Sequence, residues 1–262
     1  MSKLFAALFL FLVANLVAAV ELTETQYQLV KEDIKRLYQQ PADSMSFLEQ
    51  REVNNQLYIS SISPRHGEMR IKLPIKKDHL RILQVPHAFF DLKTGEIGQQ
   101  WFEQAPEDVR PDILMRNVEH RYETEKSDLS RIPKSLFTAV VDTFLEMQMQ
   151  IAIIQVHGFN DARRETVSAG GADFILSNGT PIPEPYLLAV QSCLRDNNGL
   201  LARVYGRDVF ELGATINPVG RLINRRNTNK ASFLHIEMPS RIRTAFAEQQ
   251  IGEEATRCLL GR

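Results

Sequence analysis

Short, almost wholly apolar runs recur along the chain, and each is followed by a polar or turn-forming segment. The clearest are LRILQVP (80–86), IAIIQV (151–156) and SFLHIEM (232–238). Runs of this length and composition are typical of strands buried on both faces of a parallel sheet. Strands and helices alternate through the second half of the chain. We therefore expect a single α/β domain, a three-layer sandwich around a mainly parallel or mixed sheet.

Other segments complete this prediction. Helices are expected over 24–40, 132–150 and 183–197, and over 241–260 with Ser240 as the cap. Shorter strands are expected at 173–178 and 201–206, and a strand pair around 57–74. The stretch 101–117 is expected to form one short helix, and 91–98 and 213–227 are interpreted as loops.

The first nineteen residues are predicted to be a secretory signal peptide. One lysine precedes the apolar run LFAALFLFLVANLVAAV, and Val17 and Ala19 suit the small-residue cleavage positions. A transmembrane anchor is the alternative, but the run is at the short limit for a span and no basic cluster follows it. We expect residues 20–262 to be an exported protein, periplasmic or secreted, without a stable membrane anchor.

Charge and cysteine content narrow the possible functions further. The formal net charge is −1 and no long basic run is present, which argues against nucleic-acid binding. In an oxidising compartment Cys193 and Cys258 would pair in a disulfide, and isolated buried thiols are the alternative. Neither has a second cysteine at the spacing of a zinc knuckle, which excludes a cysteine-based zinc site.

Histidines close three of the apolar runs, at His87, His157 and His235. The carboxylates nearby in sequence are Asp91, Asp161 and Glu237. Because ligands bind at the carboxyl ends of the strands in open α/β sheets, these side chains can converge on one crevice. Three imidazoles with carboxylates predict a metal-dependent hydrolytic site.

Two of these pairs have a spacing with a structural meaning. If the segment after His87 curls into a helical turn, His87 and Asp91 face the same way; the alternative is a core histidine and a solvated aspartate. In an extended strand His235 and Glu237 point to the same side. A glutamate beside a metal can deprotonate the attacking water and protonate the leaving amine. A salt bridge from Glu237 to Arg241 or Arg243 is the alternative.

Arginines could bind a substrate carboxylate through paired hydrogen bonds. Arg121 lies in NVEHRYE, and Arg225 lies in the segment that precedes the His235 strand. Solvated surface arginines are the alternative for each.

Taken together, these segments resemble N-formylglutamate amidohydrolase-like proteins and, more distantly, zinc carboxypeptidase-type hydrolases. The matching segments are PHAFFD (86–91), NVEHRY (117–122) with DLSRIPKSLF (128–137), VHGF (156–159) and FLHIE (233–237). The resemblance implies one zinc ion held by two histidines and a carboxylate, a glutamate general base and an arginine that grips the substrate carboxylate. Carried over, the ligands are His87, Asp91 and His157, the base is Glu237, and the arginine is Arg121 or Arg225.

This sequence departs from the carboxypeptidase pattern at one position. That pattern has a glutamate three residues after the first histidine, where this chain has Phe90. Asp91 is interpreted as its substitute, with Asp161 or Glu96 as alternatives. His235 is an alternative ligand, which His87 would then support.

These observations lead us to expect an exported zinc hydrolase of an amide or peptide bond. The expected substrate carries a carboxylate: an acyl amino acid, a cell-wall peptide or a γ-glutamyl polymer. Two rivals remain. A serine esterase of the α/β-hydrolase type would use Ser168 or Ser177, although no G-x-S-x-G elbow is present. A non-catalytic exported protein would use the arginines to bind an anionic ligand.

Overall fold

The computed structural model describes residues 21–39, 45–61, 67–73, 77–122 and 128–261. The predicted signal peptide lies outside these residues. Within them, no helix has both the length and the apolar composition needed to cross a membrane.

A single mixed sheet of nine strands forms the centre of the described chain. In spatial order the strands are β1 (Leu48–Val53), β2 (Gln56–Ser61), β3 (Glu68–Lys72), β5 (Ile113–Arg116), β4 (His79–Val85), β6 (Gln150–Phe159), β9 (Ala231–Pro239), β7 (Phe174–Ser177) and β8 (Ala202–Val204). The central strands β5, β4, β6 and β9 are parallel. The first three form an antiparallel meander, and β7 runs antiparallel to β9.

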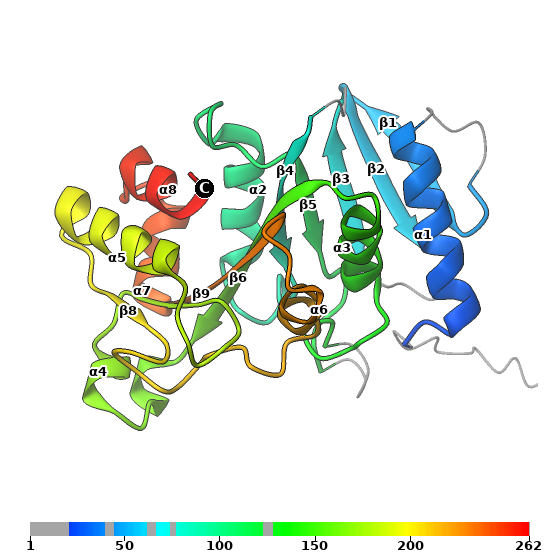
Figure 1. The fold of residues 1–262 in the computed structure, drawn as a ribbon. Coiled ribbons are helices and arrows are strands. Elements are labelled where there is room, and N and C mark those ends of the chain that lie inside the picture. The colour runs from blue at the N-terminus through cyan, green and yellow to red at the C-terminus, as the bar shows by residue number, and fades with distance from the viewer. Residues whose placement is uncertain (1–20, 40–44, 62–66, 74–76, 123–127, 262) are drawn as a thin grey trace, which may run out of the picture.

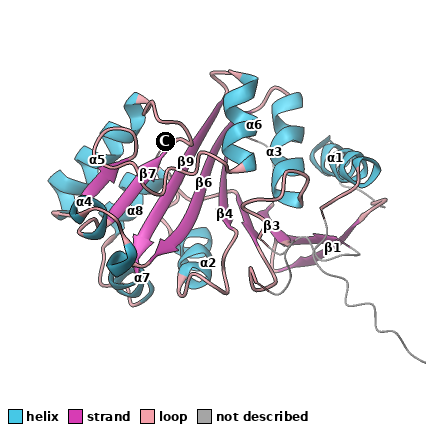
Figure 2. Cartoon of the chain, turned by 90° about the horizontal axis from the view of Figure 1, so that it is seen from below, coloured by secondary structure: helices cyan, strands magenta, loops and turns pink. Residues whose placement is uncertain are grey.

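Helices cover both faces of this sheet (Figure 1). One face carries α1 (Glu24–Gln39), α3 (Leu136–Glu146) and α6 (Pro218–Arg226). The other carries α2 (Thr94–Gln104), α5 (Pro185–Asn198), α7 (Ser240–Ala247) and α8 (Glu253–Leu260). Figure 2 shows α1, α3 and α6 on one side of the sheet and α2 and α7 on the other. The predicted three-layer α/β sandwich with a mixed sheet is thus confirmed.

Successive side chains of β6 point to opposite faces of the sheet, and on one face they change from apolar to polar along the strand. Ile151 and Ile153 pack under α1, α3 and α6, whereas Ile154 and Val156 belong to the core on the opposite face. Beyond Ile153, the next two residues on the α3 and α6 face are Gln155 and His157, both buried. The carboxyl half of β6 therefore carries polar side chains into the interior.

Some of the predicted helices and loops were wrong, the first of them the helix over 101–117. Instead of one helix over 101–117, the structure has α2 beginning at Thr94 and the short strand β5. Pro106 and Pro111 separate the two, and a four-residue apolar run does not reveal its own type.

The segment 213–227, interpreted as a loop, contains α6. Asn217 caps this helix and Pro218 opens it, which is a recognisable start signal. The last predicted helix is divided into α7 and α8 at Gly252, and Pro239 rather than Ser240 occupies the cap of α7.

Candidate metal centre

A tight turn after β4 brings Asp91 back to His87. The backbone N–H groups of Phe90 and Asp91 both donate to the carbonyl of His87, at 2.9 Å each. The Asp91 carboxylate thereby reaches the ring, with Oδ2 3.1 Å from His87 Nδ1. The expected placement of both side chains on one turn is therefore observed.

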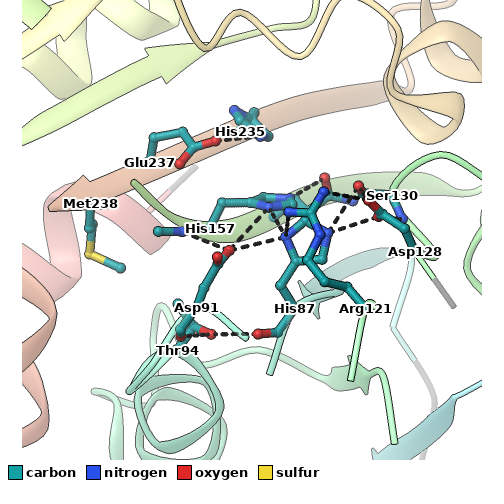
Figure 3. A network of polar contacts seen from close by, with 12 residues as sticks. His87, Asp91, Thr94, Arg121, Asp128, Ser130, His157, His235, Glu237 and Met238 are labelled. Carbon is teal, nitrogen blue, oxygen red and sulfur yellow. Dashed lines mark hydrogen bonds and ion pairs between the residues drawn. The ribbon is translucent and has the colours of Figure 1, made fainter. Parts of the chain in front are cut away.

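The adjacent strand β6 adds a second imidazole to this pair (Figure 3). His157 Nδ1 lies 3.0 Å from His87 Nδ1 and 3.6 Å from Asp91 Oδ2. The same Asp91 oxygen accepts a hydrogen bond from the backbone N–H of Gly158, at 2.9 Å. All three side chains are buried, and they form a compact group of possible metal ligands.

The dimensions of this group fit a zinc ion. Two histidines and a carboxylate are ordinary zinc ligands, with bonds of about 2.0–2.2 Å in tetrahedral geometry. Neighbouring ligand atoms are then roughly 3.3 Å apart, a separation that follows from those bond lengths. The three separations here are 3.0, 3.1 and 3.6 Å. The three residues therefore match three corners of a zinc tetrahedron and leave the fourth for another ligand.

Asp128 supports His87 from its other side. Asp128 Oδ1 lies 2.8 Å from His87 Nε2, and its second oxygen accepts from Arg121 Nη2 at 2.6 Å. Ser130 Oγ also lies 3.1 Å from His87 Nε2. A carboxylate on the far nitrogen of a ligating histidine orients the ring and makes it a stronger ligand.

Buried amides orient His157 in a similar way. Gln155 Oε1 accepts from His157 Nε2 at 2.9 Å and from Asn217 Nδ2 at 2.6 Å. Gln155 Nε2 in turn donates to Gln84 Oε1 at 3.0 Å. Because an amide oxygen only accepts, His157 carries its proton on Nε2. Its Nδ1 lone pair is thus available to the cluster.

Strand β9 contributes His235 and Glu237 on the same face. Glu237 is the register partner of His157, and the His235 ring lies 4.6 Å from the His157 ring between centroids. His235 Nε2 is 3.7 Å from Glu237 Oε1, too long for a hydrogen bond. His235 Nδ1 and Glu237 Oε2 are buried without a hydrogen-bond partner in the described chain. Together with His157 these residues form a second, looser ligand group whose atoms lie within 4.8 Å of one another.

The two arginines considered as salt-bridge partners of Glu237 are engaged elsewhere. Arg241 pairs with Asp173. Arg243 donates to the carbonyl of Met238 at 3.0 Å, and its guanidinium lies against the backbone of Gly158. A Cβ at position 158 would lie 1.6 Å from Arg243 Nη1, so a larger residue there would require the Arg243 guanidinium to move.

Burial and neighbouring charges shift the pKa values of the cluster in opposite directions. Burial raises the pKa of Glu237 to about 8, and the negative charge of Asp91 adds to this effect. Burial, with the nearby His87, lowers the pKa of His157 to about 4. Burial alone would lower the pKa of His87, but hydrogen bonds to Asp128 and Asp91 outweigh it and raise that pKa. His157 is thus neutral at pH 7, as a metal ligand must be, whereas the raised pKa of His87 means that a metal binding there would displace a proton from it.

Of the other predicted site residues, one belongs to this cluster and three do not. Arg121 belongs to it, since Nη1 is 3.3 Å from His87 Nδ1. Arg225 does not contact it: Arg225 is exposed on α6 and lines a pocket with residues of α1 and α3. Asp161 and Glu96 are exposed, and Glu96 pairs with Lys93.

Sequence reasoning missed the residues that hold the ligands in place. Asp128 lies in the quoted DLSR segment, but nothing in the sequence connects it with His87. Gln155 could have been found, because it lies two residues before His157 and so shares its face of β6. Asn217 is recognisable only as a helix cap.

Fold and site together define an α/β protein with a buried histidine–carboxylate cluster suited to a metal ion. No protein-family model and no curated protein matches the chain. Among solved structures, a Shewanella denitrificans protein described provisionally as a carboxypeptidase A is 12% identical, with a TM-score of 0.48, over 90% of this chain and 69% of that chain. An aspartoacylase-family protein from Mesorhizobium loti is 10% identical, with a TM-score of 0.45, over 82% and 71% of the two chains.

A gene product of Agrobacterium tumefaciens is 12% identical, with a TM-score of 0.44, over 71% of this chain and 88% of that one. Likeness at this level leaves the family unassigned, and the function proposed below rests on the site's own residues.

Proposed function

We propose that this protein is an exported zinc-dependent hydrolase that cleaves an amide or peptide bond in a carboxylate-bearing substrate. The observation that carries the proposal is the triangle of His87 Nδ1, Asp91 Oδ2 and His157 Nδ1, whose sides of 3.0–3.6 Å suit one zinc ion. A zinc ion held there would supply Lewis acidity to polarise the scissile carbonyl and acidify the attacking water.

Glu237 is the proposed general base. A carboxylate oxygen of Glu237 lies within 4.8 Å of a His157 ring nitrogen, so it is close to the proposed ligands without belonging to the tighter group. It makes no salt bridge to Arg241 or Arg243, and burial raises its pKa to about 8. A carboxylate with a pKa near the working pH can take a proton from the attacking water and pass it to the leaving nitrogen.

Arg121 is the proposed substrate-binding residue. Its guanidinium is largely buried between the Phe90 and Tyr122 rings, 5.1 Å from each centroid, and Nε has no hydrogen-bond partner in the described chain. Held beside His87 in this way, it can orient a substrate carboxylate and stabilise the developing oxyanion. Arg225, too far along α6 to contact the cluster, is better explained by a different role.

The two rival functions receive less support from the geometry. Ser177 is buried and donates to the carbonyl of Gly213 at 2.6 Å, and Ser168 contacts the carbonyl of Asp208. Ser177 is the register partner of His235 across β7 and β9, but in the part of the chain that is described neither serine hydroxyl is hydrogen-bonded to a histidine. A protein that only binds anions would not need His87 and His157 with nitrogens 3.0 Å apart.

Metal content tests the proposal directly. The purified protein is expected to hold close to one equivalent of zinc by elemental analysis, and His157→Ala to hold none, since a three-ligand site cannot lose an imidazole and bind zinc tightly. His79→Ala is the matched control, because His79 begins the strand that His87 follows but is absent from both ligand groups. Full zinc occupancy in His157→Ala would end the assignment.

Export is supported by the sequence pattern of the first nineteen residues and by a disulfide between Cys193 and Cys258. Mass spectrometry of the mature protein is expected to give an N-terminus at Val20. An N-terminus at Met1 would contradict cleavage.

A further inference from the structure

A pocket separate from the metal centre opens between α1, α3 and α6. Its volume is about 420 Å³, within the range of small-molecule sites. Figure 2 shows these three helices together on one side of the sheet. The pocket is lined from α1 by Tyr27, from α3 by Thr138 and from α6 by Arg221, Leu222 and Arg225.

Positive charge dominates the lining. The basic residues are Arg131, Lys134, Arg221 and Arg225, and the acidic ones are Glu24 and Asp142. Both acids are already paired. Glu24 bonds Lys134 at 2.9 Å, and Asp142 bonds Lys31 at 3.0 Å and Arg226 at 2.6 Å. The charges of Arg221 and Arg225 are therefore left uncompensated.

In each of these two guanidiniums, Nε is hydrogen-bonded to a backbone carbonyl. Arg221 Nε donates to the carbonyl of Thr215 at 2.9 Å, and Arg225 Nε donates to the carbonyl of Arg221 at 3.2 Å. Within the described chain, neither has a carboxylate partner for its terminal nitrogens. Like charges four residues apart on a helix repel each other, and a bound anion would relieve that repulsion. The two guanidiniums also offer paired hydrogen-bond donors to a carboxylate.

Apolar side chains stand beside the arginines. Ile216 lines the pocket although it is 57% exposed, and Pro218 and Leu222 continue the apolar surface. A large exposed aliphatic side chain next to two unpaired arginines matches a ligand with a charged end and a short apolar part.

We propose that this pocket is a second binding site, which takes an organic carboxylate with a short aliphatic portion. Arg221 and Arg225 hold the carboxylate, and Ile216 and Leu222 pack on the carbon chain. The pocket adjoins the metal centre through Arg131, whose Nε lies 3.6 Å from Asp128, the residue that supports His87. Its ligand is either the remote end of an extended substrate or a separate effector of the same chemistry.

Calorimetric titration of the metal-free, full mature chain with hexanoate tests the site without reference to catalysis. Hexanoate is expected to bind at one site. Hexanamide, which is neutral, and acetate, which lacks the carbon chain, are each expected to bind at least tenfold more weakly. The double variant Arg221→Ala/Arg225→Ala is expected to lose at least tenfold in affinity. Both arginines are exposed, so the fold should survive, and Arg225→Gln provides a milder second variant.

Two controls define where hexanoate binds. Arg195→Ala removes an exposed arginine of α5 that pairs with Asp196, away from the pocket, and should leave the affinity unchanged. Arg121→Ala should also leave it unchanged, because Arg121 belongs to the metal centre. The proposal is overturned if hexanoate does not bind, if the double variant binds it equally well, or if Arg121→Ala abolishes binding.

Kinetics with the zinc-loaded protein and an amide substrate then distinguish the two sources of ligand. Competitive inhibition by hexanoate that is lost in Arg221→Ala/Arg225→Ala identifies the pocket as part of the substrate site. A change in kcat at saturating substrate identifies a separate effector. Because binding is measured on the metal-free chain, failure of the zinc-hydrolase proposal would leave the pocket result standing.

Discussion

At the scale of single residues, Glu237 differs from the other carboxylates of the cluster. Asp91 and Asp128 are hydrogen-bonded to histidines, whereas Glu237 Oε2 has no hydrogen-bond partner in the described chain. A carboxylate that is buried without a hydrogen-bonded partner has a raised pKa and is well placed to exchange a proton near neutral pH.

Glu237→Gln should therefore keep zinc and the fold but lose activity. Turnover of an amide substrate, selected from N-acyl amino acids and γ-glutamyl peptides, is expected to fall by roughly two to four orders of magnitude. Zinc content and circular dichroism are the accompanying measurements. Unchanged turnover would rule out Glu237 as the base, and loss of zinc would make it a ligand.

The same substitution should change how stability depends on pH in the metal-free protein. Burial raises the pKa of Glu237 from 4.5 to about 8, so the folded state binds more protons than the unfolded state between these values. The stability that Glu237 contributes is then complete below pH 4.5 and is lost as the pH rises to 8. At about 1.4 kcal/mol per pKa unit, the loss is a few kcal/mol.

Urea unfolding of both proteins from pH 4 to pH 9 measures this difference. The gap between the two curves reports Glu237 together with the groups coupled to it, Asp91 and His87. The decline should be smaller in Glu237→Gln than in the unaltered chain, and the part that comes from the raised pKa of His87 should remain. Parallel curves would mean that Glu237 ionises normally in the fold.

The central site residues could be found from sequence because each sits at the end of an apolar run. A histidine in that position, with a carboxylate one turn or two residues away, is a local pattern. Asp128 and Asn217 could not be found this way, because they reach His87 and Gln155 across 41 and 62 residues of sequence. Their roles depend on tertiary packing, which one sequence does not report.

At the scale of elements, strand β6 and helix α7 are in close contact at Gly158. Gly158 follows His157 in β6, and the Arg243 guanidinium of α7 occupies the space where a side chain would begin. Gly158 also donates its N–H to Asp91. This contact sets the approach of α7 to the strand that carries a proposed ligand.

Gly158→Ala should destabilise the protein, by roughly 1–3 kcal/mol for an overpacked contact. The cost should shrink in an Arg243→Ala background, where the space is vacated, and a double-mutant cycle of urea unfolding measures the coupling. Additive effects of the two substitutions would show that the contact with Arg243 is not the cause.

Element prediction succeeded where the hydrophobic period was strong and long, as in α3 and β6. It failed for β5, which has four residues, and for α6, which has nine residues of which few are apolar. A short apolar run fits more than one structure, and the apolar face of α6 is well segregated but too short to stand out beside the polar segment that contains it.

At the scale of the whole molecule, the disulfide joins two helices that are distant in sequence. Cys193 of α5 and Cys258 of α8 are 65 residues apart, and their pairing was one of the two sequence alternatives. The bond closes a loop that contains β8, α6, β9 and α7. In the chain-entropy model, closing a loop of this length stabilises the fold by about 4 kcal/mol.

Titration of denatured, unreduced protein should accordingly find no free thiols. The double variant Cys193→Ser/Cys258→Ser should unfold at lower urea concentration, with a loss of up to about 4 kcal/mol. Two titratable thiols in protein recovered from its native compartment would mean that the bond does not form there.

The layered architecture followed from the alternation of strand and helix patterns, but the order of the strands did not. β5 lies between β3 and β4, and β9 lies between β6 and β7. The first insertion pairs β5 with β3 as well as with the preceding strand β4, and the second pairs β9 with β6, from which β7 and β8 separate it in the chain. The site depends on the second insertion, since it sets Glu237 beside His157. Local sequence patterns predict which segments are strands, but they do not determine which strands pair with one another in the sheet.

Asn217 is hydrogen-bonded in two directions, and this has a thermodynamic consequence. Its Oδ1 accepts from the first turn of α6, while its Nδ2 donates to Gln155, which orients His157. A displacement of α6 is therefore transmitted to the proposed ligand His157. If hexanoate in the α6 pocket changes zinc affinity by some factor, linkage requires zinc to change hexanoate affinity by the same factor. Asn217 and the contact of Arg131 with Asp128 are two routes by which the two ligands would then report on each other.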